Sequence, residues 1–139
     1  MENRVCASST QSYIQLKTGI DLVYIKDIQD LGDKPIGVWL TEREWKDILN
    51  LSNNAQKLQR LAGKFACKEA VIKVLGSSIS KVELVDIEIL HNNSGKPIIF
   101  LQGSALPYWR QIAACHLDVS ISHHGDYALA IAVAICSNN

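Results

Sequence analysis

Residues 54–76, NAQKLQRLAGKFACKEAVIKVLG, predict one long helix around which the rest of the chain folds. Asn54 is a residue type that caps helix starts, and Gly76 is the type that commonly follows a helix end, so the helix is expected to run to about Leu75. At about 100° per residue, one face of this helix is apolar. The side chains on that face are Leu58, Ala62, Phe65 and Ile72.

Glu69 falls near the middle of this apolar face, where a carboxylate needs an ion-pair partner, hydrogen bonds or a metal ion. Lys73 follows at i+4, so one interpretation is an ordinary intrahelical ion pair. The other interpretation uses Asp21, which interrupts an apolar strand predicted over 19–25 (GIDLVYI) and supplies a second carboxylate. Two convergent carboxylates beside a lysine suit a hard divalent cation and a phosphate.

The long helix is also basic, because Glu69 is the single acid among five Lys and Arg side chains between residues 57 and 73. One interpretation is a solvated flank of the helix. Beside a metal-type carboxylate pair, the same bases could instead bind a polyanion such as a nucleotide or a coenzyme. The basic residues are Lys57, Arg60, Lys64, Lys68 and Lys73.

Patterns elsewhere predict an α+β fold, in which a mainly antiparallel sheet packs on the long helix. Thr41 and Glu44 form a capping box that starts a second helix, and Pro107 fits the first turn of a short helix over 104–115. Alternation predicts a half-buried strand over 82–90, joined by a turn at 92–95 to a returning strand over 97–101. Further strands are expected over 117–122 and 127–136, with a turn at 123–126 between them.

The composition is that of an ordinary globular chain: 139 residues, 47% of them hydrophobic, with 14 basic side chains balancing 14 acidic ones. This length supports one domain, which we place at 13–139 after a flexible tail at 1–12. The balanced charge argues against nucleic-acid binding, and no apolar run is long enough to span a bilayer. We therefore expect neither a nucleic-acid nor a membrane partner, and a cytoplasmic location. The four cysteines form no CxxC pair, which leaves zinc and redox motifs unsupported.

Several short motifs occur in one order along the chain: Gly19-Ile-Asp21, Leu40-Thr-Glu-Arg-Glu44, Phe65-Ala-Cys-Lys-Glu-Ala70-Val-Ile-Lys73, Gly95-Lys-Pro97 and Val119-Ser-Ile-Ser-His123. From about residue 17 to residue 136, the chain thereby resembles the holo-acyl-carrier-protein synthases, which are short 4′-phosphopantetheinyl transferases. The segment FxxKEAxxKxxG is specific to that family, and the GxD motif upstream strengthens the match, whereas GKP alone is weak.

The resemblance implies transfer of 4′-phosphopantetheine from coenzyme A to a serine of an apo acyl carrier protein in fatty-acid or polyketide synthesis, with Mg²⁺ as the cofactor. By position, Asp21 and Glu69 would hold the metal, and Glu69 or a metal-bound water would accept the serine proton. Lys73 would contact phosphate and stabilise the transferred group. Lys64 would help to bind the coenzyme.

The resemblance also places residues near the nucleotide end of coenzyme A, with lower specificity than the carboxylates. These residues are Gly76, Lys96, Pro97 and His123. In the family, three identical chains associate and the sites lie between neighbours, so the resemblance implies a homotrimer.

Three departures from the family pattern leave the level of activity open; one is Tyr24, which stands where some relatives have a Glu near the metal. Asp118 stands where many members have a histidine; it could accept a proton or add a metal ligand, but its charge opposes phosphate binding. His116, on the same face of the predicted strand, is a candidate substitute. Asp27 stands where an Arg commonly docks the acidic carrier, within a segment, 21–47, that carries seven acids and four bases. We expect an active transferase; the alternative is a relative that binds coenzyme A or a partner without turnover.

Overall fold

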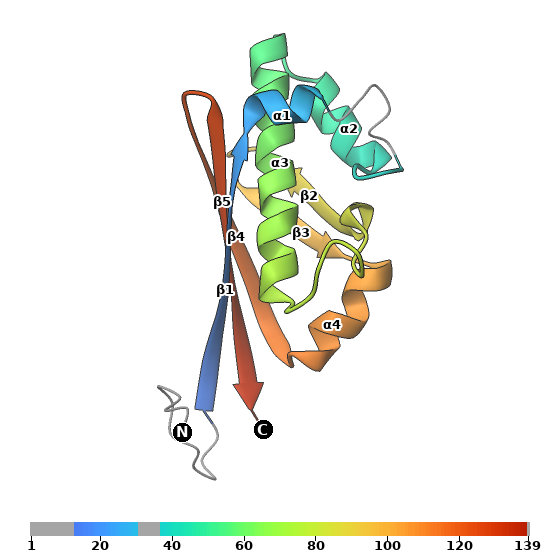
Figure 1. Ribbon diagram of the computed structural model, residues 1–139, viewed down its shortest axis with the longest axis vertical. Coiled ribbons are helices and arrows are strands. Elements are labelled where there is room, and N and C mark those ends of the chain that lie inside the picture. Colours follow the sequence, from blue (N-terminus) through green and yellow to red (C-terminus); the bar gives the residue numbers. More distant parts are fainter. Residues whose placement is uncertain (1–12, 31–36, 139) are drawn as a thin grey trace.

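Three antiparallel strands form the main sheet of the computed structural model, which describes residues 13–30 and 37–138 (Figure 1). They are β1 (Tyr13–Tyr24), β4 (Ala114–His124) and β5 (Tyr127–Asn138). β5 is central and pairs with both of the others. The apolar run at 127–136 is therefore a strand paired with its predecessor, and the predicted α+β class is confirmed.

The long helix α3 (Asn54–Val74) packs on one face of this sheet, against β1 and β5 (Figure 1). Successive side chains of a strand point to opposite faces, and every second residue of β5 is a buried alanine. These alanines are Ala128, Ala130, Ala132 and Ala134. The helix contributes the fully buried Ala62, Ala66 and Ala70. Small side chains on both surfaces let α3 approach the sheet closely, which places its other side chains next to those of β1.

The remaining elements lie on the same side of the main sheet as α3 (Figure 1). The helices are α1 (Ile25–Gln29), α2 (Glu42–Leu49) and α4 (Leu106–Gln111). A hairpin is formed by β2 (Ile87–His91) and β3 (Pro97–Leu101), and short 3₁₀ turns occur at η1 (Leu84–Asp86) and η2 (Gly103–Ala105). Within the described ranges, none of the helices has the length and apolar character needed to cross a membrane.

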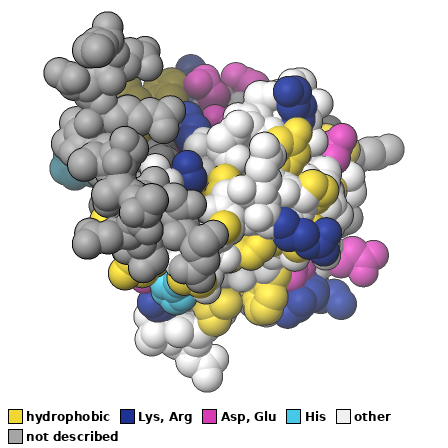
Figure 2. All heavy atoms as spheres, turned by 90° about the horizontal axis from the view of Figure 1, so that it is seen from below, with side chains coloured by type: hydrophobic (Ala, Val, Ile, Leu, Met, Phe, Trp, Pro, Cys, Tyr) yellow, Lys and Arg dark blue, Asp and Glu magenta, His cyan; other side chains and the backbone are white. Residues whose placement is uncertain are grey.

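The opposite face of the main sheet is not covered by any described element and is apolar. Ile20 is paired with Ile131 and Leu22 with Leu129, and all four side chains are exposed. Together with the exposed Leu16 they form one continuous surface, which we call the open sheet face. Figure 2 shows the lower end of the molecule, where hydrophobic side chains reach the surface among basic and acidic ones. Large exposed apolar surfaces are uncommon on monomers and indicate association.

Several predicted boundaries are corrected by the structure. The cap of α3 is Asn53, whose side chain accepts a hydrogen bond from the backbone N–H of Gln56, and not Asn54. The strand predicted over 82–90 begins only at Ile87, because residues 84–86 form η1. The strand predicted over 19–25 begins earlier, at Tyr13, and ends at Tyr24, because Ile25 starts α1. The tail predicted at 1–12 lies outside the described residues.

The apolar face of α3 also differs from the prediction. Two of the four predicted residues, Ala62 and Ile72, are buried in the core, and the other buried apolar residues of the helix are Ala66, Cys67, Ala70, Val71 and Val74. Phe65 and Glu69 are half-buried at the border of that face, so Glu69 is not near its middle. The predicted end of the helix is confirmed: Gly76 adopts a φ of 69°, which favours glycine, and the N–H of Ser77 reaches back to the Ile72 carbonyl.

Candidate active site

Gly19 brings β1 unusually close to α3. The carbonyl group of Ala70 occupies the space in which a β-carbon at residue 19 would lie. Asp21 is two residues further along the strand and therefore points to the same face, toward the helix. The GxD pattern thus has a physical reason, because the glycine permits the contact that places the aspartate beside α3.

Asp21, Glu69 and Lys73 meet at this contact, so the structure brings together the three residues singled out from the sequence. Lys73 Nζ donates a hydrogen bond to the backbone carbonyl of Ile20 at 2.6 Å and lies 3.3 Å from Asp21 Oδ1. Lys73 therefore pairs with Asp21 of β1. The sequence had also allowed a simple ion pair with Glu69 within the helix. The Asp21 side chain is 13% exposed and that of Lys73 is 54% exposed, so solvent and ligands reach the lysine.

The pKa of the Glu69 carboxyl group is raised above its usual value. Burial is the largest cause, followed by the negative charge of Asp21 and a hydrogen bond to it, while Lys73 opposes the shift. Two adjacent carboxylates repel each other when both are ionised, so the pair retains a proton more readily or gains from binding a cation. The site can therefore accept a proton on Glu69 and hold positive charge between Asp21 and Glu69.

Mg²⁺ fits the donor chemistry of this pair. It prefers carboxylate oxygens and completes its coordination shell with water and substrate phosphates, so it needs only one or two protein carboxylates. In the part of the chain that the structure describes, no cluster of three or more His, Cys, Asp or Glu side chains is arranged to hold a metal ion. Among the described residues, Asp21 and Glu69 form a carboxylate pair of the kind that suits such an ion.

Two basic residues of α3 are buried, which excludes the interpretation of a uniformly solvated flank. Lys68 and Glu44 are both fully buried, with 2.7 Å between Lys68 Nζ and Glu44 Oε1. Glu44 also accepts hydrogen bonds from the backbone N–H groups of Thr41 and Ile89. Burial lowers the pKa of Lys68, and the charge of Glu44 opposes that shift. The pair therefore holds α2 and β2 against α3.

Lys64, predicted to contact the coenzyme, is also fully buried. Its Nζ lies 2.8 Å from Asp47 Oδ2, which in turn is 3.1 Å from Arg60 Nη1 and 3.2 Å from His91 Nδ1. Burial alone would raise the pKa of Asp47, but the hydrogen bond and charge of Lys64, followed by the charges of Arg60 and His91, lower it overall. Burial and the two bases lower the pKa of His91 to about 4. Arg60, with 25% of its side chain exposed, is the more accessible base of this cluster.

Pro97 and His123, which the resemblance places near the nucleotide end of coenzyme A, lie together but far from Glu69. Pro97 and His123 line a cavity of about 200 Å³ with Arg60. His123 Nε2 is hydrogen-bonded to the carbonyl of Gln59 at 2.8 Å, close to the N-terminal end of α3. Glu69 is ten residues further along the helix, or about 15 Å at 1.5 Å per residue. The two groups of residues are therefore well separated within one chain.

Lys96 and Asp118 form an exposed ion pair, with 3.5 Å between Nζ and Oδ1. The carboxylate that departs from the family pattern thus faces the lysine of the GKP motif. His116 and Asp118 line one cavity on the open sheet face, so the two residues share a strand face as expected. The turn predicted over 123–126 is shorter, because His123 and His124 belong to β4 and pair with β5.

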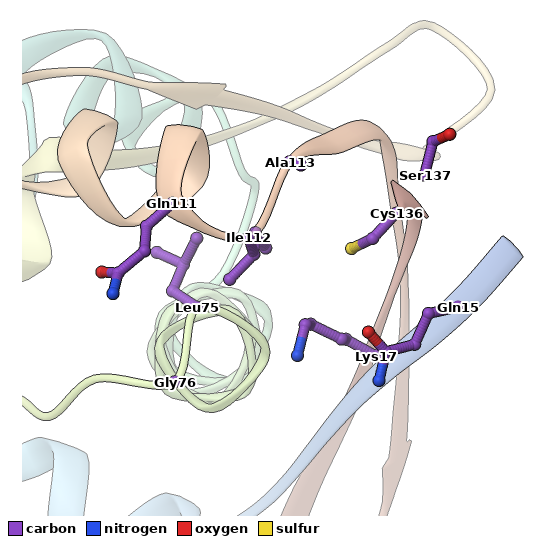
Figure 3. Close-up of a pocket in the computed structure, with 9 residues that line it drawn as sticks. All are labelled: Gln15, Lys17, Leu75, Gly76, Gln111, Ile112, Ala113, Cys136 and Ser137. Atoms are coloured by element: carbon purple, nitrogen blue, oxygen red, sulfur yellow. The ribbon is translucent and has the colours of Figure 1, made fainter. Parts of the chain in front are cut away.

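Gly76 lines a different cavity, of about 440 Å³, beyond the end of α3 (Figure 3). Figure 3 shows Lys17 of β1 directed toward the end of the helix, with Gln111 of α4 on the other side. The structure therefore separates Gly76 from Lys96, Pro97 and His123, although the resemblance assigns all four to one end of the coenzyme.

The fold and these contacts agree with a comparison against protein families. A family model described as the 4′-phosphopantetheinyl transferase superfamily matches residues 17–132, which include Asp21, Glu69 and Lys73. The chain belongs to this superfamily. Its GxD and FxxKEAxxK motifs supply the strand and helix residues that meet at the contact between Gly19 and Ala70.

Curated relatives and solved structures in the superfamily are similar over most of their length. The holo-[acyl-carrier-protein] synthase of Geobacillus sp. (strain WCH70) is 40% identical over 116 residues, which cover 81% of this chain and 89% of the relative. That of Caldanaerobacter subterraneus subsp. tengcongensis is 33% identical over 129 residues, covering 91% and 99%. The crystal structure of the Bacillus anthracis holo-(acyl-carrier-protein) synthase in complex with CoA (3′,5′-ADP) has a TM-score of 0.71 at 30% identity, covering 86% and 96%.

The acidic partners of the buried lysines were not predicted from the sequence. Glu44 was assigned only to a capping box, and Asp47 was given no role. The residue spacing did indicate these pairs. Glu44 and Asp47 lie one turn apart on α2, and their partners Lys68 and Lys64 lie one turn apart on α3. Recognising it requires knowing that α2 packs on α3.

Proposed function

We propose that this chain is a holo-acyl-carrier-protein synthase that transfers 4′-phosphopantetheine from coenzyme A to a serine of an apo acyl carrier protein. The observation that carries the proposal is the meeting of Asp21, Glu69 and Lys73 in a member of the 4′-phosphopantetheinyl transferase superfamily. The similar proteins named above are holo-acyl-carrier-protein synthases, and one of their structures contains CoA (3′,5′-ADP).

The residues of this site suit the chemistry of the transfer. The serine oxygen forms a bond to the phosphorus of phosphopantetheine, the bond from that phosphorus to 3′,5′-ADP breaks, and the serine proton must leave. The Glu69 carboxylate, with its raised pKa, is suited to accept that proton. The Lys73 ammonium group, more than half exposed, is suited to contact phosphate oxygens and to offset the charge gained by the leaving 3′,5′-ADP.

Asp21 and Glu69 are the residues that would hold Mg²⁺. When bound, the ion supplies positive charge against the pyrophosphate of coenzyme A. Asp21 is held in place by the pairing of β1 with β5, and Glu69 by the packing of α3 on that sheet. The two carboxylates therefore come from rigid elements, which favours a defined site over one built on loops.

We further propose that the active form is a homotrimer in which a neighbouring chain completes the site. The open sheet face supports association, because it leaves Leu16, Leu22 and Ile131 exposed. The rise of about 15 Å along α3 from Gln59, which contacts His123, to Glu69 separates the two groups of residues and is in keeping with a shared site. A coenzyme held by Asp21 and Glu69 of one chain would reach the Lys96, Pro97 and His123 region of the next.

A carrier-modification assay tests the proposed reaction. The chain is incubated with coenzyme A, Mg²⁺ and apo acyl carrier proteins from fatty-acid and polyketide synthesis, and the carriers are weighed by intact mass spectrometry. We expect a phosphopantetheine adduct that disappears with a chelator and in Glu69→Ala. The control is Glu42→Ala, which removes an exposed acid of α2 and should retain the activity. Coenzyme A binding without an adduct on any carrier would instead support the non-catalytic relative.

Light scattering with size-exclusion chromatography tests the trimer. Leu22→Lys together with Ile131→Lys places two charges on the open sheet face and should convert the trimer to monomers. The control is Leu49→Lys, because Leu49 is 52% exposed on α2, away from that face. A wild-type chain that elutes as a monomer at micromolar concentration would contradict the proposal.

A further inference from the structure

Ser77 carries a hydroxyl group that is buried and has no hydrogen-bond partner among the described residues. Its backbone is engaged, since the N–H donates to the Ile72 carbonyl at 3.3 Å and helps to end α3. The side chain therefore has no part in the helix end. A buried hydroxyl without a partner lowers stability, so proteins retain few of them, and each one calls for an explanation.

The location of Ser77 points to a ligand. The residue lines a cavity of about 190 Å³ together with Glu69 and Lys73, so the unused hydroxyl lies beside the acid and the base of the proposed site. Ser78 lines the same cavity, but its hydroxyl is 2.8 Å from that of Ser80 and is already engaged. Ser77 and Ser78 thus differ in whether the hydroxyl group has a partner, and Ser78 is also the more exposed of the two.

We infer that the Ser77 hydroxyl donates a hydrogen bond to a pyrophosphate oxygen of coenzyme A, which makes Ser77 a further substrate-binding residue. This inference rests on the proposed function. Ionised phosphate oxygens accept hydrogen bonds, and rotation of the serine side chain between staggered positions is enough to turn its hydroxyl toward the cavity. The pyrophosphate is the matching part of the coenzyme, because Ser77 shares its cavity with Glu69 and Lys73 and not with His123.

The inference predicts opposite effects on binding and on stability. Ser77→Ala removes a hydroxyl that has no hydrogen-bond partner among the residues that the structure describes, so without metal and ligand its melting temperature should equal or exceed that of the wild type. The same variant should bind coenzyme A less tightly. A serine that merely supports the fold would show the reverse, with a lower melting temperature and a largely unchanged affinity.

Isothermal titration calorimetry in the presence of Mg²⁺ tests the contact. Coenzyme A and dephospho-coenzyme A, which keeps the pyrophosphate but lacks the 3′-phosphate, are titrated into the wild type, Ser77→Ala, Ser77→Thr and Ser78→Ala. We expect Ser77→Ala to weaken both ligands by about tenfold, the scale of one hydrogen bond to a charged acceptor. Ser77→Thr, which keeps a hydroxyl, should restore most of the affinity, and Ser78→Ala should stay within about twofold. Ser77→Cys, similar in size but a weaker donor, replaces the alanine variant if that variant does not fold.

Three results would overturn the inference. Equal affinities of Ser77→Ala and the wild type would show that the hydroxyl does not contact the coenzyme. A loss confined to coenzyme A and absent with dephospho-coenzyme A would place the hydroxyl at the 3′-phosphate instead. An equal loss in Ser78→Ala would remove the distinction between the two serines. If the wild type itself binds neither ligand, the proposed function is wrong and this inference is wrong with it.

Discussion

Gly19 of β1 and Ala70 of α3 touch at the level of the backbone, because the Ala70 carbonyl fills the place of a β-carbon at residue 19. This contact decides where Asp21 lies relative to Glu69, since one residue is on the strand and the other on the helix. The geometry of the proposed site is thus a consequence of how closely the sheet and the helix pack.

Gly19→Ala should therefore damage both the fold and the site. The added methyl group has to push β1 away from α3, which we expect to lower the free energy of unfolding by about 1–3 kcal/mol and to weaken coenzyme A binding. Urea unfolding followed by circular dichroism and titration calorimetry measure the two effects. Lys46→Ala, at an exposed position of α2 away from this contact, is the control and should change stability by less than about 0.5 kcal/mol. A Gly19→Ala protein as stable as the wild type would contradict the close approach.

Lys68→Met tests the buried ion pair that joins α2 to α3. Removing the lysine leaves Glu44 fully buried without its counter-ion, and such losses cost about 3–5 kcal/mol of unfolding free energy. The matched control is Lys96→Met, which breaks an ion pair whose side chains are both more than half exposed and should cost less than about 1 kcal/mol. Urea unfolding of both variants at neutral pH gives the comparison. Similar losses in the two variants would show that burial does not distinguish the pairs.

The proposed catalytic group was predicted from the sequence on two grounds. Asp21 interrupts an apolar strand, and Glu69 and Lys73 belong to the FxxKEAxxK motif, which lies within the residues that the family model matches. Periodicity was also sufficient for α3 and for the strand order at the end of the chain. These features depend on residues close together in the sequence, where alternation and helix caps carry the information.

Burial of charged residues was not predictable in the same way. Glu88 alternates with the apolar Ile87 and Ile89, a pattern typical of a residue that faces solvent. It is nevertheless buried, where Thr41 Oγ1 at 2.6 Å and Arg43 Nη1 at 2.9 Å donate hydrogen bonds to it. Lys64 was assigned to the coenzyme, but it reaches Asp47 on another helix. In each case the residue that pairs with the buried charge belongs to another element of the fold. Periodicity shows which face of a helix or strand a residue lies on, but it does not show which element packs on that face.

His91 gives the protein a pH-dependent stability. Its pKa is about 4 in the folded chain and about 6.5 when unfolded, so between these values the unfolded state binds a proton that the folded state does not. The free energy of unfolding should therefore fall as the pH is lowered from about 6.5 to 4, by at most about 1.4 kcal/mol per pH unit from this residue. Urea unfolding at intervals across this range measures the slope.

The His91→Asn variant isolates this contribution. Asparagine does not titrate, so the difference between wild type and variant should depend on pH between about 4 and 6.5 and become constant above that range. Asp47 affects only the lower end of this range, because the unfolded chain begins to protonate that carboxylate below about pH 5 while the folded chain, with its lowered pKa, does not. His124→Asn, at an exposed position of β4, is the control. Equal slopes in the wild type and His91→Asn would show that His91 is not kept neutral by burial.

Asp118→Asn tests what the departure from the family pattern does. In the wild type, Asp118 faces Lys96 at 3.5 Å and adds negative charge where the coenzyme's phosphates are proposed to bind. The variant removes that charge and frees the lysine, so we expect coenzyme A to bind up to about fivefold more tightly, the effect of an exposed ion pair. The gain should diminish at high salt, because both side chains are exposed and screened by ions. Titration calorimetry at low and high ionic strength measures it, with Asp27→Asn on α1 as a control that removes an acid elsewhere. Weaker binding by Asp118→Asn would instead assign the carboxylate a direct part in holding the metal or the coenzyme.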